Sequence, residues 1–141
     1  MAETLMLHEI ENTKSFILAG NAEFKITNLN SNNHFIYHVT KSDNNPHLYF
    51  VNVKEGHSWV YAGFLSENND NITYKQGNKG SLQDNSPAIK GLLWAIKHGN
   101  KPLTRPMVLT HLGKCAYSHK KLTDDISIQR GFGPVCWKKI F

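Results

Sequence analysis

One stretch of the sequence decides how we interpret the rest: His111-Leu-Gly-Lys-Cys115-Ala-Tyr-Ser-His119-Lys-Lys-Leu-Thr-Asp-Asp-Ile-Ser-Ile-Gln-Arg-Gly131-Phe-Gly133-Pro134-Val-Cys136. It holds both cysteines of the chain and two of its eight histidines. Zinc in proteins is held by four thiolate or imidazole ligands arranged as a tetrahedron. A close group of ligands followed by a distant one is typical of zinc fingers. The spacing therefore predicts a structural zinc site made by His111, Cys115, His119 and Cys136.

Two other interpretations of the cysteines remain open. Cys115 and Cys136 can be reduced, buried residues that pack as small apolar side chains. They can also form a disulfide, although disulfides are rare in the cytosol and no part of the chain is typical of a secretion signal. Gly113, Gly131 and Gly133 favour a tightly wound segment under any of these interpretations, because glycine accepts backbone angles that other residues avoid.

The same stretch resembles a known family. The residues that carry the resemblance are Gly113-Lys-Cys115-x-x-Ser118, Leu122-Thr123-Asp124-x-x-Ser127 and Gly131-x-Gly133-Pro134-x-Cys136. They are similar to a small cysteine-containing domain of unknown function that is common in bacteriophage proteins, with the pattern Gly-x-Cys-x-x-Cys-Gly-Arg-x-Leu-Thr-Asp-Pro-x-Ser followed by Gly-x-Gly-Pro-x-Cys. That family is usually taken as zinc-binding, and some members are attached to phage DNA-processing proteins. The resemblance covers roughly residues 111 to 139.

The sequence departs from the family pattern at two positions. Ser118 stands where the family has its second cysteine, and His119 stands where the family has glycine. Serine is a poor zinc ligand, so either His119 replaces the lost ligand or the site holds no metal. A histidine two residues before the first glycine is frequent in the family, and His111 matches it.

Charge is divided unevenly along the chain, whose formal net charge is +5. Residues 1–70 contain four Lys and eight Asp or Glu, which gives −4, and residues 71–141 contain twelve Lys or Arg and three Asp, which gives +9. A basic half beside a predicted metal site favours an anionic partner, with nucleic acid first. A solvated basic face without a ligand explains the count equally well.

The first half of the chain predicts an antiparallel meander. Segments 22–29, 34–40, 48–53, 59–65 and 72–75 are apolar or alternating and are separated by turns rich in Asn and Asp. We also interpret the short apolar segment 15–18 as β structure. Aromatic residues between lysines can form a stacking platform for single strands, with candidates Tyr37, Tyr49, Trp59, Tyr61 and Tyr74. Because aromatics are ordinary sheet residues and this half is acidic, we expect a structural role for them.

The best helix signal in the chain is 86–98. Ser86 is a capping residue, Pro87 suits the first helical position, and Ile89, Leu92, Leu93 and Ile96 form one apolar stripe. We expect an α+β fold in which an antiparallel β-meander is packed by this one main helix, over residues 1–105. A small zinc-finger-like module would follow over residues 106–141, with a short strand at 107–109 and a short helix from Thr123 to about Arg130.

We expect a binding protein and not an enzyme. Cys115 and His119 can form a nucleophile–base pair, but their spacing fits shared metal coordination at least as well. The leading hypothesis is a phage-type, zinc-stabilised protein that acts on nucleic acid or on a nucleic-acid-handling complex in the cytoplasm of a bacterial host, with no membrane partner. Phosphate contacts would come from Lys114, Lys120, Lys121, Arg130, Lys138 and Lys139. The alternative is a protein–protein inhibitor of a host machine such as a bacterial defence nuclease, of an anti-defence or anti-CRISPR-like kind.

Overall fold

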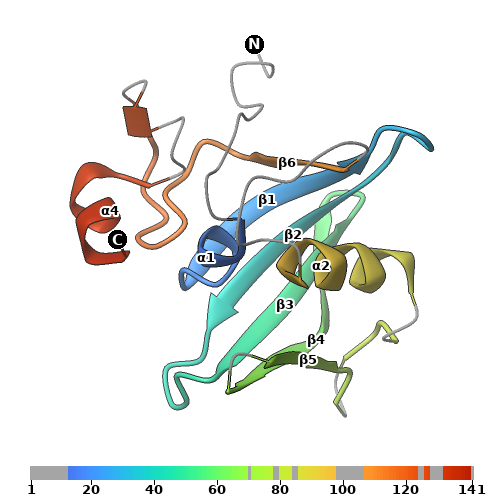
Figure 1. Cartoon of the computed structure of the whole chain (residues 1–141). Coiled ribbons are helices and arrows are strands. Elements are labelled where there is room, and N and C mark those ends of the chain that lie inside the picture. Colours follow the sequence, from blue (N-terminus) through green and yellow to red (C-terminus); the bar gives the residue numbers. More distant parts are fainter. Residues whose placement is uncertain are drawn as a thin grey trace.

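A six-stranded antiparallel sheet forms the frame of the molecule (Figure 1). The structure is a computed structural model that describes residues 13–69, 71–77, 80–83, 86–97, 107–123, 126–127 and 132–140. The strand order is β5-β4-β3-β2-β1-β6, so the first five strands form a meander and the last returns to pair with the first. In chain order the strands are β1 (Asn21–Asn28), β2 (Asn33–Lys41), β3 (Leu48–Glu55), β4 (Ser58–Asn68), β5 (Asn71–Lys75) and β6 (Met107–His111).

Alternation along each strand gives the sheet two different faces. In β1, Ala22, Phe24 and Ile26 are buried, whereas Glu23 and Lys25 are only half-buried. Successive side chains of a strand point to opposite faces, and the antiparallel register carries each set across the sheet. Phe24, for example, lies opposite Tyr37 of β2 and His111 of β6. The face that holds Phe24 is therefore the core face.

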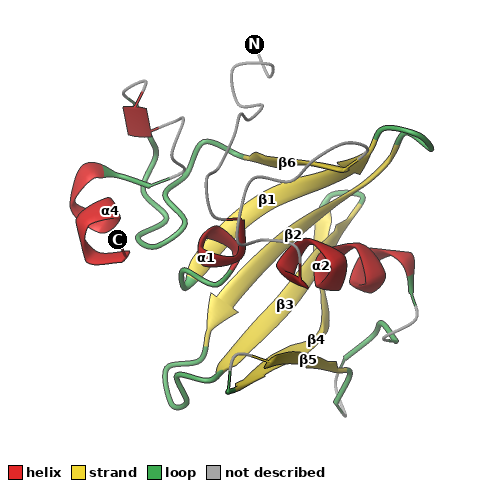
Figure 2. Ribbon diagram, in the orientation of Figure 1, coloured by secondary structure: helices red, strands yellow, loops and turns green. Residues whose placement is uncertain are grey.

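The helices α1 (Thr13–Ile17) and α2 (Pro87–Lys97) lie on the same side of the sheet (Figure 2). α2 buries the stripe predicted from its sequence, which includes Ile89, Leu92 and Ile96. The hydroxyl of Tyr37 donates a hydrogen bond of 2.6 Å to the carbonyl of Ala88 and so fixes the first turn of α2 to the middle of the sheet. Helix α4 (Pro134–Ile140) lies near the C-terminus.

The C-terminal segment shares the core of the sheet. β6 extends the sheet beyond β1, and Cys115, Ala116, Leu122 and Phe132 belong to the same buried cluster as the strands and α2. The ring of Phe132 packs edge-on against Phe16 of α1, with centroids 5.8 Å apart. The boundary that we predicted at residues 105 and 106 lies outside the described residues.

Most of the predicted elements are confirmed. The five strands of the meander, the main helix and the strand at 107–109 all form, each within a few residues of its expected bounds. The prediction of β structure at 15–18 is wrong, because this segment belongs to helix α1 and its end. Helix α4 was not predicted. Of the helix expected from Thr123 to about Arg130, residues 123, 126 and 127 are described; residues 126 and 127 are helical and residue 123 is not.

The described helices are all short, and none is long and apolar enough to cross a lipid bilayer.

Candidate functional site

The two cysteines line one cleft, which is formed by residues of the C-terminal segment. Both Cys115 and Cys136 are reduced and buried, and both line a cleft of about 410 Å³. The loop 113–123 forms one wall, and Gly133 and the first turn of α4 contribute the other. The remaining polar side chains that line this cleft are Ser118, Lys120, Lys121, Thr123 and Ser127.

Hydrogen bonds surround the sulfur of Cys115. The backbone N–H of Ser118 donates to its Sγ at 3.4 Å. Burial raises the pKa of the Cys115 thiol, but hydrogen bonds from the Ser118 hydroxyl and from the backbone N–H groups of Ser118, Gly133 and Tyr117 outweigh burial and lower the pKa to about 7. Ser118, which stands where the pattern that the sequence resembles has a second cysteine, thus donates hydrogen bonds to Cys115. The loop conformation suits a thiolate at position 115.

His111 lies in the core and faces away from this cleft's polar groups. It occupies the β6 position opposite Phe24, is fully buried and lies with its ring centroid 6.2 Å from that of Phe16. Its Nδ1 accepts a hydrogen bond of 2.9 Å from the backbone N–H of Gly113. The side chain therefore helps to turn the chain at the end of β6.

His119 crosses to the opposite face of the sheet. Its backbone has a positive φ of 66°, which redirects the chain after the tight loop that begins at Cys115. Its Nε2 lies 3.0 Å from Oε1 of Glu23, and its ring stacks on that of His38 with centroids 5.1 Å apart. Glu23 also pairs with Lys114 at 3.5 Å. The loop is thus fastened to β1 and β2 from the side that α2 does not cover.

The structure does not bring the four predicted zinc ligands together. His111 points to the core face and His119 to the other face, so the thickness of the sheet separates them, and only the two cysteines share a cleft. In the part of the chain that the structure describes, no group of three or more His, Cys, Asp or Glu side chains could hold a metal ion. Cys115 and Cys136 line one cleft, and His111 and His119 make the contacts described above. Zinc binding stays a prediction.

A second feature of the molecule is the sheet surface turned away from α2, which we call the open face. It carries a set of rings from three strands and the C-terminal loop, namely His38, Phe50, Trp59, Tyr61 and His119. The rings of Phe50 and Tyr61 are 6.3 Å apart, and those of His38 and Trp59 are 5.8 Å apart. The Nζ of Lys54 lies 5.6 Å from the centroid of the Trp59 ring.

The open face is basic although the first half of the chain is acidic. The strand register turns Lys25, Lys54 and Lys75 to this face, together with one carboxylate, Glu23. That carboxylate is paired with Lys114 and His119. The fold thus collects positive charge around the exposed rings.

The structure changes the set of aromatic residues that are candidates for stacking. Tyr37, Tyr49 and Tyr74 are buried in the core. Trp59 and Tyr61 do lie on the open face, and Phe50 and the two stacked histidines were missed. The sequence did contain one signal: Phe50 shares its face of the strand with Asn52 and Lys54, and this mostly polar set indicates that Phe50 faces solvent.

The predicted phosphate-binding residues are only partly described. Lys120, Lys121 and Lys138 are exposed, and Lys114 is engaged with Glu23. Arg130 and the side chain of Lys139 lie outside what the structure describes. Lys114 lies beside Glu23 of the open face, whereas Lys120 and Lys121 line the cleft that also holds the two cysteines.

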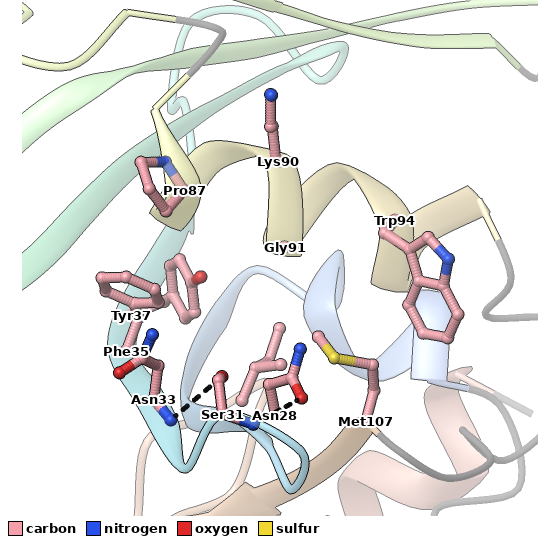
Figure 3. A pocket seen from close by; sticks show the side chains of 11 residues that line it. Asn28, Ser31, Asn33, Phe35, Tyr37, Pro87, Lys90, Gly91, Trp94 and Met107 are labelled. Atoms are coloured by element: carbon pink, nitrogen blue, oxygen red, sulfur yellow. Dashed lines mark hydrogen bonds between the residues drawn. The ribbon is translucent and has the colours of Figure 1, made fainter.

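A hollow of about 420 Å³ lies between α2 and the end of the β1–β2 hairpin (Figure 3). Phe35 and Tyr37 lie at one side of it, and Trp94 and Met107 lie at the other. Lys90 is the one charged side chain of its lining, and the hydroxyl of Tyr37 is already bonded to Ala88. The hollow can accept an apolar group, but it offers no pair of groups for acid–base catalysis.

Comparison with known proteins gives one match. A model described as a family of unknown function (DUF6011) matches residues 109–141, which run from the end of β6 to the end of the chain. The chain is thus similar, over this segment, to an uncharacterised family of small proteins. No curated protein and no solved structure matches the chain.

Proposed function

We propose that this chain is a small, non-catalytic binding protein that acts on nucleic acid or on a complex that handles nucleic acid. The observation that supports the proposal most strongly is the attachment of the C-terminal loop to the open face. Through Glu23, Lys114 and His119, the fold places a lysine-rich loop next to a sheet surface that is itself basic. A continuous basic surface is the electrostatic requirement for binding phosphates.

The proposal keeps the remaining features expected from the sequence. The protein would be phage-encoded and would act in the bacterial cytoplasm. The segment that resembles phage proteins is also the segment that carries the predicted phosphate-binding lysines. A structural zinc at Cys115 and Cys136 would add stability to this loop. The basic surface would work without it, because His119 and Lys114 already hold the loop by contacts to Glu23.

The proposal is tested by measuring binding of the purified protein to single- and double-stranded DNA and RNA in low salt. The double variant Lys120→Glu/Lys121→Glu should weaken binding strongly and make the dependence on salt shallower, because each phosphate contact contributes a slope of about −0.7 to −0.9 in log–log form. The matched control is Lys90→Glu/Lys97→Glu, which makes the same change in charge on exposed positions of α2. It should bind nearly as the wild type does.

Two results would contradict the proposal. One is the absence of detectable binding to any of the four nucleic acids, and the other is an equal loss in both double variants. In the first case the protein–protein inhibitor becomes the hypothesis to test. A partner retained from a bacterial lysate after nuclease treatment would then support it.

A further inference from the structure

We infer that the open face binds single-stranded nucleic acid by stacking unpaired bases on its exposed rings. The inference rests on the proposed function and narrows it to one class of ligand. In this inference, aromatic residues of β2, β3 and β4 contact the nucleic acid in addition to the lysines of the proposed function. Phe50 and Trp59 are the principal contacts to the bases.

Phe50 and Trp59 are exposed to an unusual degree for their size. Their side chains are 36% and 39% accessible, and both lie on the open face, on neighbouring strands. Burying an aromatic side chain stabilises a folded protein by roughly 2 to 3 kcal/mol, and these two side chains gain only part of it. Their exposure therefore indicates surfaces that are available to a ligand.

The rings are also held in place before any ligand binds. The ring of Trp59 lies 5.8 Å from that of His38, and the ammonium of Lys54 lies over it at 5.6 Å from its centroid. His38 is fixed in turn by a contact of 2.6 Å between its Nε2 and Oδ1 of Asn21, and by stacking on His119. Prearranged side chains lose little conformational entropy on binding, which favours affinity.

The surroundings of the rings favour nucleic acid over a protein partner. The centre of a protein–protein interface is depleted of charged residues, whereas Lys54 lies directly at the Trp59 ring and polar Asn52 lies between His38 and Tyr61 in the register. Rings with lysines beside them suit a ligand that alternates flat bases with phosphates. Bases within a duplex are already stacked, so an open sheet can reach their faces only in a single strand.

The test compares the affinity of a fluorescein-labelled 15-nucleotide oligothymidine with that of a duplex of equal length, in the same low-salt buffer. The wild type should prefer the single strand. Trp59→Ala and Phe50→Ala should each weaken single-strand binding by about fivefold or more, since a stacked base contributes about 1–3 kcal/mol. Duplex affinity should change little. Trp59→Phe should restore most of the affinity because it restores a ring.

Leu29→Ala is the matched control, because Leu29 is equally exposed but lies in the β1–β2 turn, away from the open face. It should bind as the wild type does, and urea unfolding should show that all four variants are folded. The inference would be overturned if Trp59→Ala and Phe50→Ala bound the single strand as tightly as the wild type does, or if the wild type preferred the duplex. Either result would leave the proposed function standing. If the wild type bound no nucleic acid, both the inference and the proposed function would be overturned.

Discussion

Gly63 is the residue whose identity the sheet constrains most tightly. It lies in β4 at the point where the register with β3 shifts, between the pairs Val51–Gly63 and Asn52–Tyr61. A Cβ atom at this position would lie 2.6 Å from the carbonyl oxygen of Lys75 and would collide with the Tyr74 hydroxyl. That hydroxyl lies 2.6 Å from the carbonyl oxygens of both Ala62 and Leu82, to either of which its one proton can be donated, and so ties the segment 80–83 to the sheet.

We therefore expect Gly63→Ala to lower the free energy of unfolding by about 1–3 kcal/mol, through overpacking of a filled site. Gly133→Ala is the control, because a Cβ there meets nothing within 4 Å. It should change stability by less than about 0.5 kcal/mol. Urea unfolding of both variants measures the difference, and equal stabilities would show that β5 does not close over Gly63 as described.

Ser118 lies beside Cys115 in the cleft that both cysteines line. Its hydroxyl and its N–H both serve Cys115, which favours the thiolate. Position 118 therefore faces the sulfur at hydrogen-bond distance. A cysteine introduced there would add a third thiol to the pair that already lines the cleft.

We accordingly expect Ser118→Cys to bind zinc at least tenfold more tightly than the wild-type chain, as measured by competition with a zinc-binding dye. Soft thiolates are preferred ligands of zinc, and each added ligand completes more of the tetrahedron. Ser58→Cys, at an exposed position of β4, adds a cysteine elsewhere and should leave the zinc affinity unchanged. Equal affinities of wild type and Ser118→Cys would show that the cleft cannot gather a metal.

At the level of elements, the sequence predicts the sheet and the main helix well. Alternation and the Asn-rich turns are local signals, and the stripe of α2 is local too. Helix α1 was misassigned because a five-residue element contains too little of either period to be recognised. For β3, the pattern also indicates the orientation of Phe50, because Phe50 shares its face with Asn52 and Lys54.

The candidate site was less predictable because it depends on which face of the sheet each residue reaches. His111 and His119 are separated by eight positions, a spacing that suits a shared metal. β6 turns the first toward Phe16, and the positive φ at residue 119 turns the second toward Glu23. Neither direction is a local property of the sequence, since the pairing of β6 with β1 decides both.

His38 makes stability depend on pH. Burial lowers the pKa of His38 below its ordinary value of 6.5; Glu23 raises it, and His119 and Lys114 lower it further. The unfolded chain therefore takes up a proton at this residue at higher pH than the folded chain does. Stability should fall as the pH drops through 6.5 and should stop falling, for this residue, only below the folded pKa.

We expect His38→Gln to lose this part of the pH dependence. Urea unfolding of both proteins at pH 7.5 and at pH 5.5 measures it, and the variant should show the smaller loss of stability at the lower pH. Glutamine retains a polar group near Asn21, so the two proteins should both remain folded. An identical loss in both would mean that His38 is as easily protonated in the sheet as in the unfolded chain.

For the whole molecule, the fold redistributes charge in a way that counting along the chain does not show. Among the described carboxylates of the first half, Asp43 lies in a turn, and Glu55 and Glu67 fall on strand positions that alternate with those of the open face. Only Glu23 is on that face, where the C-terminal loop covers it. The described residues Lys25, Lys54 and Lys75 thus lie on one face of the sheet, and Lys114 of the C-terminal loop pairs with the carboxylate there.

We infer above all that single-stranded nucleic acid binds to the open face of the sheet. Photo-crosslinking tests it most directly: an oligonucleotide that contains 5-iodouracil is irradiated with the wild-type protein, and the linked peptides are identified by mass spectrometry. We predict crosslinks at Phe50 or Trp59, with further linked peptides from the loop 114–121. Crosslinks confined to α2 or to the hollow beneath it, with none on β3, β4 or the loop, would contradict the account.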